Sequence, residues 1–151
     1  MPTHVQPETT PKLLAIDLDG TLLRRDGTIH ADDLLAIRRL REAGVPVGIV
    51  TGRLYSGSTA AARTAGILGP IACVDGSQIV DTRDDSRLFQ RAITGQPAST
   101  LRRVLERHEA ASFLFDGDEI VHDAAGHPFT RFLSKWSTNL AQVDNVSTHA
   151  S

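Results

Sequence analysis

Short apolar runs alternate with helical patterns over the first half of the chain. Three continuous apolar runs lie at residues 12–18, 45–50 and 71–74. Such runs are typical of strands that are buried on both faces of a parallel sheet. Between them, residues 31–43 carry apolar side chains at helical spacing, and residues 58–65 are rich in alanine. Gly44 and Gly66 follow these segments, as expected at helix C-termini.

This order predicts a β-α-β-α-β unit, which requires a parallel sheet with right-handed crossovers. We therefore predict an α/β fold, with a partial doubly wound (Rossmann-like) parallel sheet. Asp26-Gly27 is a turn signal and predicts a small flap between the first strand and the first helix.

The pattern changes in the second half of the chain. Segments 78–81 and 87–93 predict a hairpin that leads away from the first sheet. Helical spacing over residues 98–110 and a second hairpin within residues 112–122 predict a separate α+β subdomain. We expect residues 128–140 to form another helix.

The composition is that of a globular protein. Of 151 residues, 40% are hydrophobic and 23% are charged, and the formal net charge is −2. Neither sign of charge forms a long run, so no nucleic-acid partner is indicated. No apolar run reaches the ~18 residues of a membrane span, and the first residues lack the features of a secretory signal. We expect a cytoplasmic protein without a membrane partner, in which the single cysteine, Cys73, has a packing role.

Two carboxylates follow the first predicted strand. Asp17 and Asp19 stand at positions i and i+2, so their side chains are expected on the same side. Parallel sheets bind ligands beyond the carboxyl ends of their strands. Neighbouring carboxylates repel each other unless a cation or a shared proton lies between them, and Mg²⁺ prefers oxygen ligands and also binds phosphate. The pair therefore predicts an Mg²⁺ site and an Asp nucleophile that forms an aspartyl-phosphate, the alternative being an acidic turn that caps the next segment.

The segment Asp17-Leu18-Asp19-Gly20-Thr21-Leu22-Leu23 resembles the first motif of the haloacid-dehalogenase-like phosphatases. This resemblance implies that Asp17 is the nucleophile. It also implies that Asp19 acts first as general acid and then as general base, with its main-chain carbonyl on Mg²⁺.

The second motif of this superfamily is a Thr or Ser at the end of the next core strand, where this chain has Thr51-Gly52-Arg53. By resemblance these three residues bind phosphate. Thr51 would donate a hydrogen bond to the phosphoryl oxygens, Gly52 would allow close approach of the backbone, and free N–H groups of the following helix would help to hold the anion. A simple helix N-cap at Thr51 is the alternative.

The segment from Cys73 to Val80 resembles the Asn-Gly-Ala segment of the Cof-type branch, after which a large α/β cap is inserted, although Asp75 and Ser77 replace Asn and Ala. A plain turn is the alternative interpretation. The resemblance divides the chain into a disordered N-terminal tail at residues 1–11, the first half of the core at 12–81, a partial α/β cap subdomain at 82–143 and a polar tail at 144–151.

Two further motifs of the superfamily, a Lys and an acidic cluster, are not evident. Lys12 and Lys135 lie outside the expected context, and Asp118 with Asp123 has the spelling of the acidic motif but falls in a predicted cap hairpin. The chain therefore resembles only the N-terminal half of such an enzyme, truncated before the third and fourth motifs. Its incomplete sheet would favour self-association or a complementing chain.

The resemblance implies a Mg²⁺-dependent phosphatase that acts on a small phosphorylated metabolite, such as a sugar phosphate. The alternative is a noncatalytic phosphate-binding or regulatory half-domain, or a truncated inactive gene product.

Overall fold

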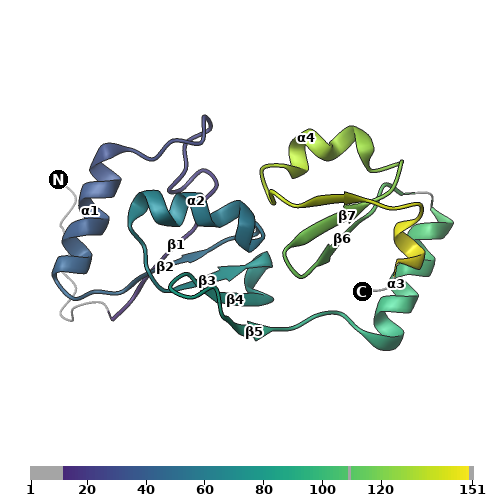
Figure 1. The fold of residues 1–151 in the computed structure, drawn as a ribbon, viewed down its shortest axis with the longest axis horizontal. Coiled ribbons are helices and arrows are strands. Elements are labelled where there is room, and N and C mark those ends of the chain that lie inside the picture. Colours follow the sequence, from purple (N-terminus) through teal and green to yellow (C-terminus); the bar gives the residue numbers. More distant parts are fainter. Residues whose placement is uncertain (1–11, 109, 150–151) are drawn as a thin grey trace, which may run out of the picture.

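The computed structural model describes residues 12–108 and 110–149, which form two β-sheets with their helices (Figure 1). The larger sheet contains β1 (Leu14–Ile16), β2 (Val47–Val50), β3 (Pro70–Cys73), β4 (Gln78–Asp81) and β5 (Arg87–Gln90), in that order. The tail expected at residues 1–11 lies outside the described residues, as do residues 150–151 of the predicted polar tail.

The β-α-β-α-β unit predicted from the apolar runs is confirmed. Strands β1, β2 and β3 are parallel neighbours, and α1 (Ala31–Glu42) and α2 (Tyr55–Ala65) connect them. His30 caps α1, because its Nδ1 atom accepts a hydrogen bond from the Asp32 amide at 3.1 Å. Gly66 ends α2 in the left-handed conformation, with φ of 64°, which glycine adopts without strain.

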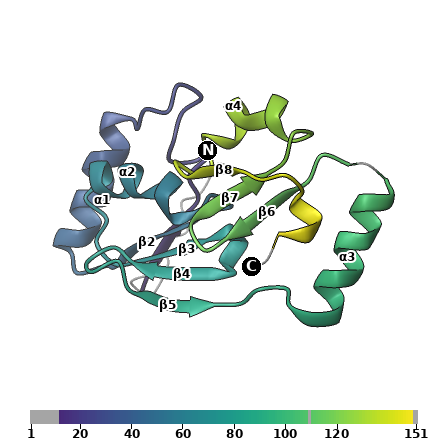
Figure 2. The same cartoon turned by 45° about the vertical axis from the view of Figure 1, so that its right-hand side comes forward.

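Both helices cover the same face of the larger sheet (Figure 2). The main core of buried residues includes strand residues Val47, Ile49, Ile71 and Cys73 and helix residues Ile37, Ala61, Ala62 and Ala65. Alternation along each strand places the intervening residues on the opposite face, where Val50 is 44% exposed. The parallel strands that end at the candidate site are therefore held in place by this core.

The hairpin predicted over residues 78–93 is present, but it does not lead away from the sheet. Strand β4 pairs antiparallel with β3 and β5 pairs antiparallel with β4, so both extend the larger sheet. The reversal after β3 is tight, because Val74 and Asp75 in η1 (Val74–Gly76) both adopt positive φ, at 50° and 52°. The division between residues 81 and 82 stays a prediction, although β5 lies in the larger sheet.

The second sheet contains β6 (Phe113–Asp116), β7 (Glu119–His122) and β8 (Leu140–Gln142), and α3 (Gly95–Arg107) precedes it. Strands β6 and β7 form the second predicted hairpin. Three short helices follow: η2 (His127–Phe129), α4 (Thr130–Leu133) and, after β8, η3 (Val146–Thr148).

The helix predicted over residues 128–140 is much shorter than expected. It ends at Leu133, and the following Ser-Lys-Trp-Ser-Thr-Asn stretch leads into β8, which pairs with β7. Ser, Thr and Asn form hydrogen bonds that compete with a helix, and here the Ser137 hydroxyl accepts from the Asn139 amide at 2.9 Å.

Candidate active site

The predicted site residues lie at one edge of the larger sheet. Asp17 directly follows β1 and Thr51 directly follows β2. Because these strands are parallel, their carboxyl ends meet at the same edge. Leu18, between the two acidic residues, is fully buried in the core, whereas Asp17 and Asp19 on either side of it are exposed to solvent.

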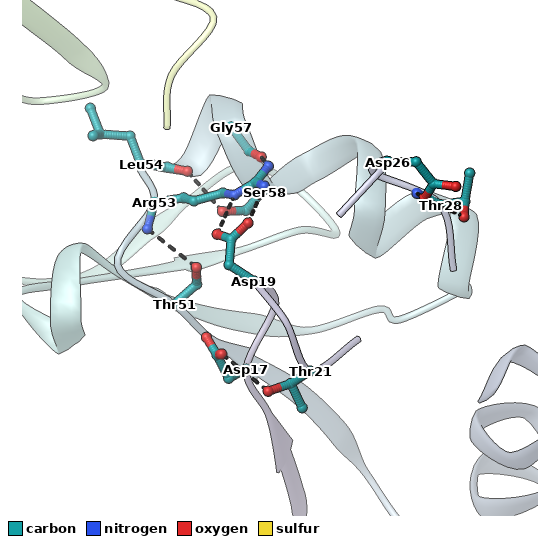
Figure 3. A network of polar contacts seen from close by, with 10 residues as sticks. All are labelled: Asp17, Asp19, Thr21, Asp26, Thr28, Thr51, Arg53, Leu54, Gly57 and Ser58. Atoms are coloured by element: carbon teal, nitrogen blue, oxygen red, sulfur yellow. Dashed lines mark hydrogen bonds and ion pairs between the residues drawn. The ribbon is translucent and has the colours of Figure 1, made fainter. Parts of the chain in front are cut away.

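The Asp17 carboxylate is held mainly by its own loop. The Thr21 hydroxyl donates to Asp17 Oδ2 at 3.3 Å, and the Leu22 amide donates to the main-chain carbonyl of Asp17 at 3.2 Å. Figure 3 shows Asp17 directed toward Thr21, whereas Asp19 points toward Arg53. The Asp17 carboxylate is therefore accessible from the solvent.

Asp19 forms a bidentate ion pair with Arg53. Arg53 Nε donates to Asp19 Oδ2 at 2.7 Å, and Arg53 Nη2 donates to Asp19 Oδ1 at 2.5 Å. Arg53 Nη1 also donates to the Gly57 carbonyl at 3.1 Å, which fixes the guanidinium on the first turn of α2. The Arg53 hydrogen bonds hold the pKa of Asp19 below its usual value, so this carboxylate is ionised at neutral pH.

Thr51 and Gly52 form the turn that joins β2 to this ion pair. Thr51 is 3% exposed, and its Oγ1 atom accepts from the Arg53 amide at 3.2 Å. A Cβ atom on Gly52 would lie 3.2 Å from Asp75 Oδ1, so the absent side chain leaves room for the Asp75 carboxylate. The structure thus brings Asp75 beside the turn that was predicted to bind phosphate.

The N-terminus of α2 is occupied by residues from the second sheet and its loops. The Leu54 amide donates to the Trp136 carbonyl at 2.9 Å, and the Ser56 amide donates to Asp118 Oδ1 at 2.8 Å. Ser56 Oγ lies 2.9 Å from Ser137 Oγ. The expectation that these helix N–H groups are free to hold the anion is therefore wrong for Leu54 and Ser56. The partners lie more than 60 residues away along the chain, and no local pattern signalled the contact.

Lys135, which lies outside the context expected for the Lys motif of the superfamily, acts on Asp19 in the structure. Its charge also lowers the pKa of Asp19, although less than Arg53 does. Lys135 follows the short helix α4, so it comes from the part of the chain that packs over α2. The structure therefore brings a second positive charge close enough to act on Asp19.

Oxygen atoms of Asp17 and Asp19 are of the kind that a hard cation binds, although both carboxylate oxygens of Asp19 accept hydrogen bonds from Arg53. Within residues 12–108 and 110–149, no group of three His, Cys, Asp or Glu side chains is placed to hold a metal. A membrane-crossing helix is also absent from this part of the chain. The arrangement combines an exposed carboxylate at Asp17, an ion-paired carboxylate at Asp19 and the buried Thr51 hydroxyl beside the Arg53 guanidinium.

Comparisons with known proteins match this chain to a hydrolase family and to phosphatases. A family model described as haloacid dehalogenase-like hydrolase matches residues 14–150. A 5-amino-6-(5-phospho-D-ribitylamino)uracil phosphatase of Bacillus subtilis is 33% identical over 120 residues, covering 80% of this chain and 44% of the relative. A pyridoxal phosphate phosphatase of Escherichia coli is 28% identical, covering 87% of this chain and 48% of the relative.

The fold is also similar to solved structures. A haloacid dehalogenase-like hydrolase from Bacteroides thetaiotaomicron superposes with a TM-score of 0.77 at 19% identity, covering 94% of this chain and 55% of that protein. The chain spans about half the length of the curated relatives that it matches.

Proposed function

The chain belongs to the haloacid dehalogenase-like hydrolases, and from this premise we propose that it carries the nucleophile half of a Mg²⁺-dependent phosphatase. The substrate would be a small phosphorylated metabolite such as a sugar phosphate, and the reaction would pass through an aspartyl-phosphate on Asp17. The observation that supports this best is the exposed Asp17 carboxylate at the end of β1, beside the Asp19–Arg53 pair. A cytoplasmic location is part of the same proposal.

The proposed reaction has two steps. An Asp17 oxygen attacks phosphorus in line, the bond from phosphorus to the ester oxygen breaks, and Asp19 protonates the leaving oxygen. Asp19 then takes a proton from a water molecule, whose oxygen attacks the phosphorus of the aspartyl-phosphate. This second step releases inorganic phosphate and restores the Asp17 carboxylate.

Arg53 has to change partner in this scheme. While the guanidinium binds Asp19, the carboxylate stays ionised and cannot donate a proton. A phosphate dianion is a competing bidentate partner for a guanidinium. We propose that the substrate draws Arg53 away, which raises the pKa of Asp19 so that it can act as the acid. Thr51 and Gly52 would complete the phosphate contacts.

The residues present fit Mg²⁺, which commonly binds through one or two carboxylates and keeps water and phosphate as its other ligands. Asp17, together with the main-chain carbonyl of Asp19, would hold it. The ion would supply charge compensation between the attacking carboxylate and the phosphate.

Turnover by this chain alone is proposed to be weak. Removing one preorganised electrostatic group can slow an enzyme by a factor of about 10²–10³. Among the described residues, Arg53 is tied to Asp19, and no third acidic side chain joins Asp17 and Asp19 in a metal-binding group. The second candidate, a noncatalytic phosphate-binding or regulatory half-domain, is favoured by the same two observations.

A phosphate-release assay with p-nitrophenyl phosphate and Mg²⁺ tests the catalytic proposal. We expect slow turnover that EDTA and Asp17→Asn both abolish. Asp26→Asn should have no effect, because Asp26 accepts its hydrogen bonds from Thr28 in the flap, away from Asp17 and Asp19. Turnover that survives Asp17→Asn would refute the assignment of Asp17 as the nucleophile. If inorganic phosphate perturbs the NMR signals of Thr51 and Arg53 but no turnover is found, the noncatalytic candidate replaces the first.

A further inference from the structure

Lys135 belongs to a segment that is fixed beside the candidate active site. Its neighbour Trp136 is held by a main-chain hydrogen bond, in which the Leu54 amide donates to the Trp136 carbonyl at 2.9 Å. Leu54 directly follows Arg53 in the chain. The Trp136 carbonyl oxygen also packs closely on Gly57, whose own carbonyl accepts from Arg53 Nη1 at 3.1 Å. The backbone of Lys135 is therefore one residue away from the turn that carries Arg53.

The ammonium group of Lys135 is exposed and has no direct partner in the described part of the chain. None of the hydrogen bonds or ion pairs formed within residues 12–108 and 110–149 involves Lys135 Nζ. Asp118 comes from the same side of the molecule, but its carboxylate accepts from the Ser56 amide at 2.8 Å and from Asn139 Nδ2 at 3.4 Å. The charge of Lys135 acts on Asp19, whose pKa it lowers. Lys135 is thus a cation near the site that is available to a ligand.

The position of Lys135 corresponds to the leaving-group side of the proposed reaction. Figure 3 shows Asp19 directed toward Arg53 and away from Asp17. In an in-line reaction the leaving oxygen lies opposite the attacking carboxylate, and Asp19 is the residue proposed to protonate it. The rest of the leaving group would therefore extend toward Arg53 and the segment that contains Lys135.

We propose, on the basis of the proposed function, that Lys135 binds a second anionic group on the leaving part of the substrate, either a carboxylate or a second phosphate. Arg53 is the cation proposed to bind the phosphoryl group, which leaves Lys135 for the second anion. An ammonium on a flexible four-carbon stem binds carboxylates and phosphates without a fixed geometry. The substrate class is thereby narrowed to phosphate esters whose leaving group is negatively charged.

Three phosphate esters of a two-carbon unit test this proposal: 2-hydroxyethyl phosphate, 2-phosphoglycolate and 1,2-ethanediol bisphosphate. They carry a hydroxyl, a carboxylate and a second phosphate at the end away from the shared ester. Two-dimensional NMR titrations of the full chain would measure each affinity through the signals of Thr51 and Arg53, with EDTA present to prevent turnover. The affinity of the bisphosphate is halved to correct for its two equivalent phosphates.

We expect at least one of the two doubly anionic probes to bind about two- to fivefold more tightly than 2-hydroxyethyl phosphate, as one exposed ion pair contributes. The probe that shows this preference identifies the second group as a carboxylate or a phosphate. The preference should decrease at about 1 M salt, which screens exposed charges.

Lys135→Met removes the charge from a long side chain and should abolish the preference. Lys12→Met makes the same change before β1, at the end of that strand away from Asp17, and should preserve it. Equal affinities for the three probes in the unaltered chain, or a preference that Lys135→Met retains, would overturn the role of Lys135 alone. If no probe perturbs Thr51 or Arg53, the phosphate site of the proposed function is refuted together with this proposal.

Discussion

The guanidinium of Arg53 controls the ionisation of the neighbouring acidic residue. It donates two hydrogen bonds to Asp19 and a third to the Gly57 carbonyl, so its position is set by α2 as well as by the carboxylate. The Asp19 side chain is 58% exposed, and solvent therefore screens much of the pair's contribution to stability. The main effect of the ion pair is therefore to keep Asp19 ionised, rather than to stabilise the fold.

Arg53→Met should raise the pKa of Asp19 toward its ordinary value of about 3.9, because the largest cause of the lowering is removed. Carboxyl ¹³C NMR titration would measure this. The stabilisation from a lowered pKa is present above the unfolded-state pKa and is lost as pH falls through the folded-state pKa. The difference in free energy of unfolding between Arg53→Met and the unaltered chain should therefore become smaller below about pH 4.

Arg63→Met, which removes an exposed charge from the same helix, serves as the control and should leave the Asp19 pKa unchanged. An Asp19 pKa that does not rise in Arg53→Met would contradict the prediction.

Cys73 illustrates how burial determines reactivity. Desolvation is the main cause that raises the pKa of its thiol to about 12, and the residue is fully buried in the main core. We predict no reaction with DTNB at pH 8 in the folded chain and full reaction in urea. Rapid labelling of the folded chain would show that β3 opens to solvent.

At the scale of elements, the first turn of α2 is the joint between the two sheets. Leu54, Ser56 and Gly57 each contact the segment from Trp136 to Ser137, through a backbone hydrogen bond, a hydroxyl pair and close packing. A Cβ atom on Gly57 would lie 2.2 Å from the Trp136 carbonyl oxygen. The close approach of these backbones therefore depends on glycine at this position.

Gly57→Ala tests this joint. Alanine favours a helix by ~1 kcal/mol over glycine, but the steric overlap forces the segments apart. We expect a net loss of about 1–3 kcal/mol in the free energy of unfolding, measured in urea, with faster hydrogen exchange at the Leu54 amide. Thr64→Ala, at an exposed position of the same helix, should change stability by about 0.5 kcal/mol or less. If Gly57→Ala instead stabilises the chain, the backbone around Trp136 can move to admit the new side chain, and the prediction is wrong.

For the whole molecule, the larger sheet has an open edge and an open face. Among the described strands, β1 pairs only with β2. On the face opposite the helices, Val50, Ala72, Ile79 and Phe89 form a row across neighbouring strands, and Val50 and Phe89 are each 44% exposed. Unpaired edges and apolar faces are sites of association.

We therefore predict concentration-dependent self-association of this chain, measurable by analytical ultracentrifugation. Ala15→Lys places a charge on the exposed side of β1 and should shift the chain toward monomer. Leu68→Lys, at a 63% exposed position in the loop after α2, should not. A monomer at every concentration would refute the prediction.

The sequence alone determined the order of the elements and much of the site. Apolar runs and helical spacing reflect local burial, so they predicted the three parallel strands, α1 and α2, and both hairpins. Because side chains at the ends of parallel strands share one edge, the pattern also placed Asp17 and Thr51 together. The family resemblance drawn from those residues is confirmed, while their catalytic roles stay predictions.

Only the tertiary structure decided which distant groups meet at that edge. It brought Arg53 onto Asp19, placed Asp118 and Trp136 at the N-terminus of α2, and kept β5 in the larger sheet. It also ended the predicted helix early, at Leu133. The physical reason is that periodicity encodes which face of an element is buried, whereas hydrogen-bond partners depend on packing between segments more than 30 residues apart, as for Asp19 and Arg53.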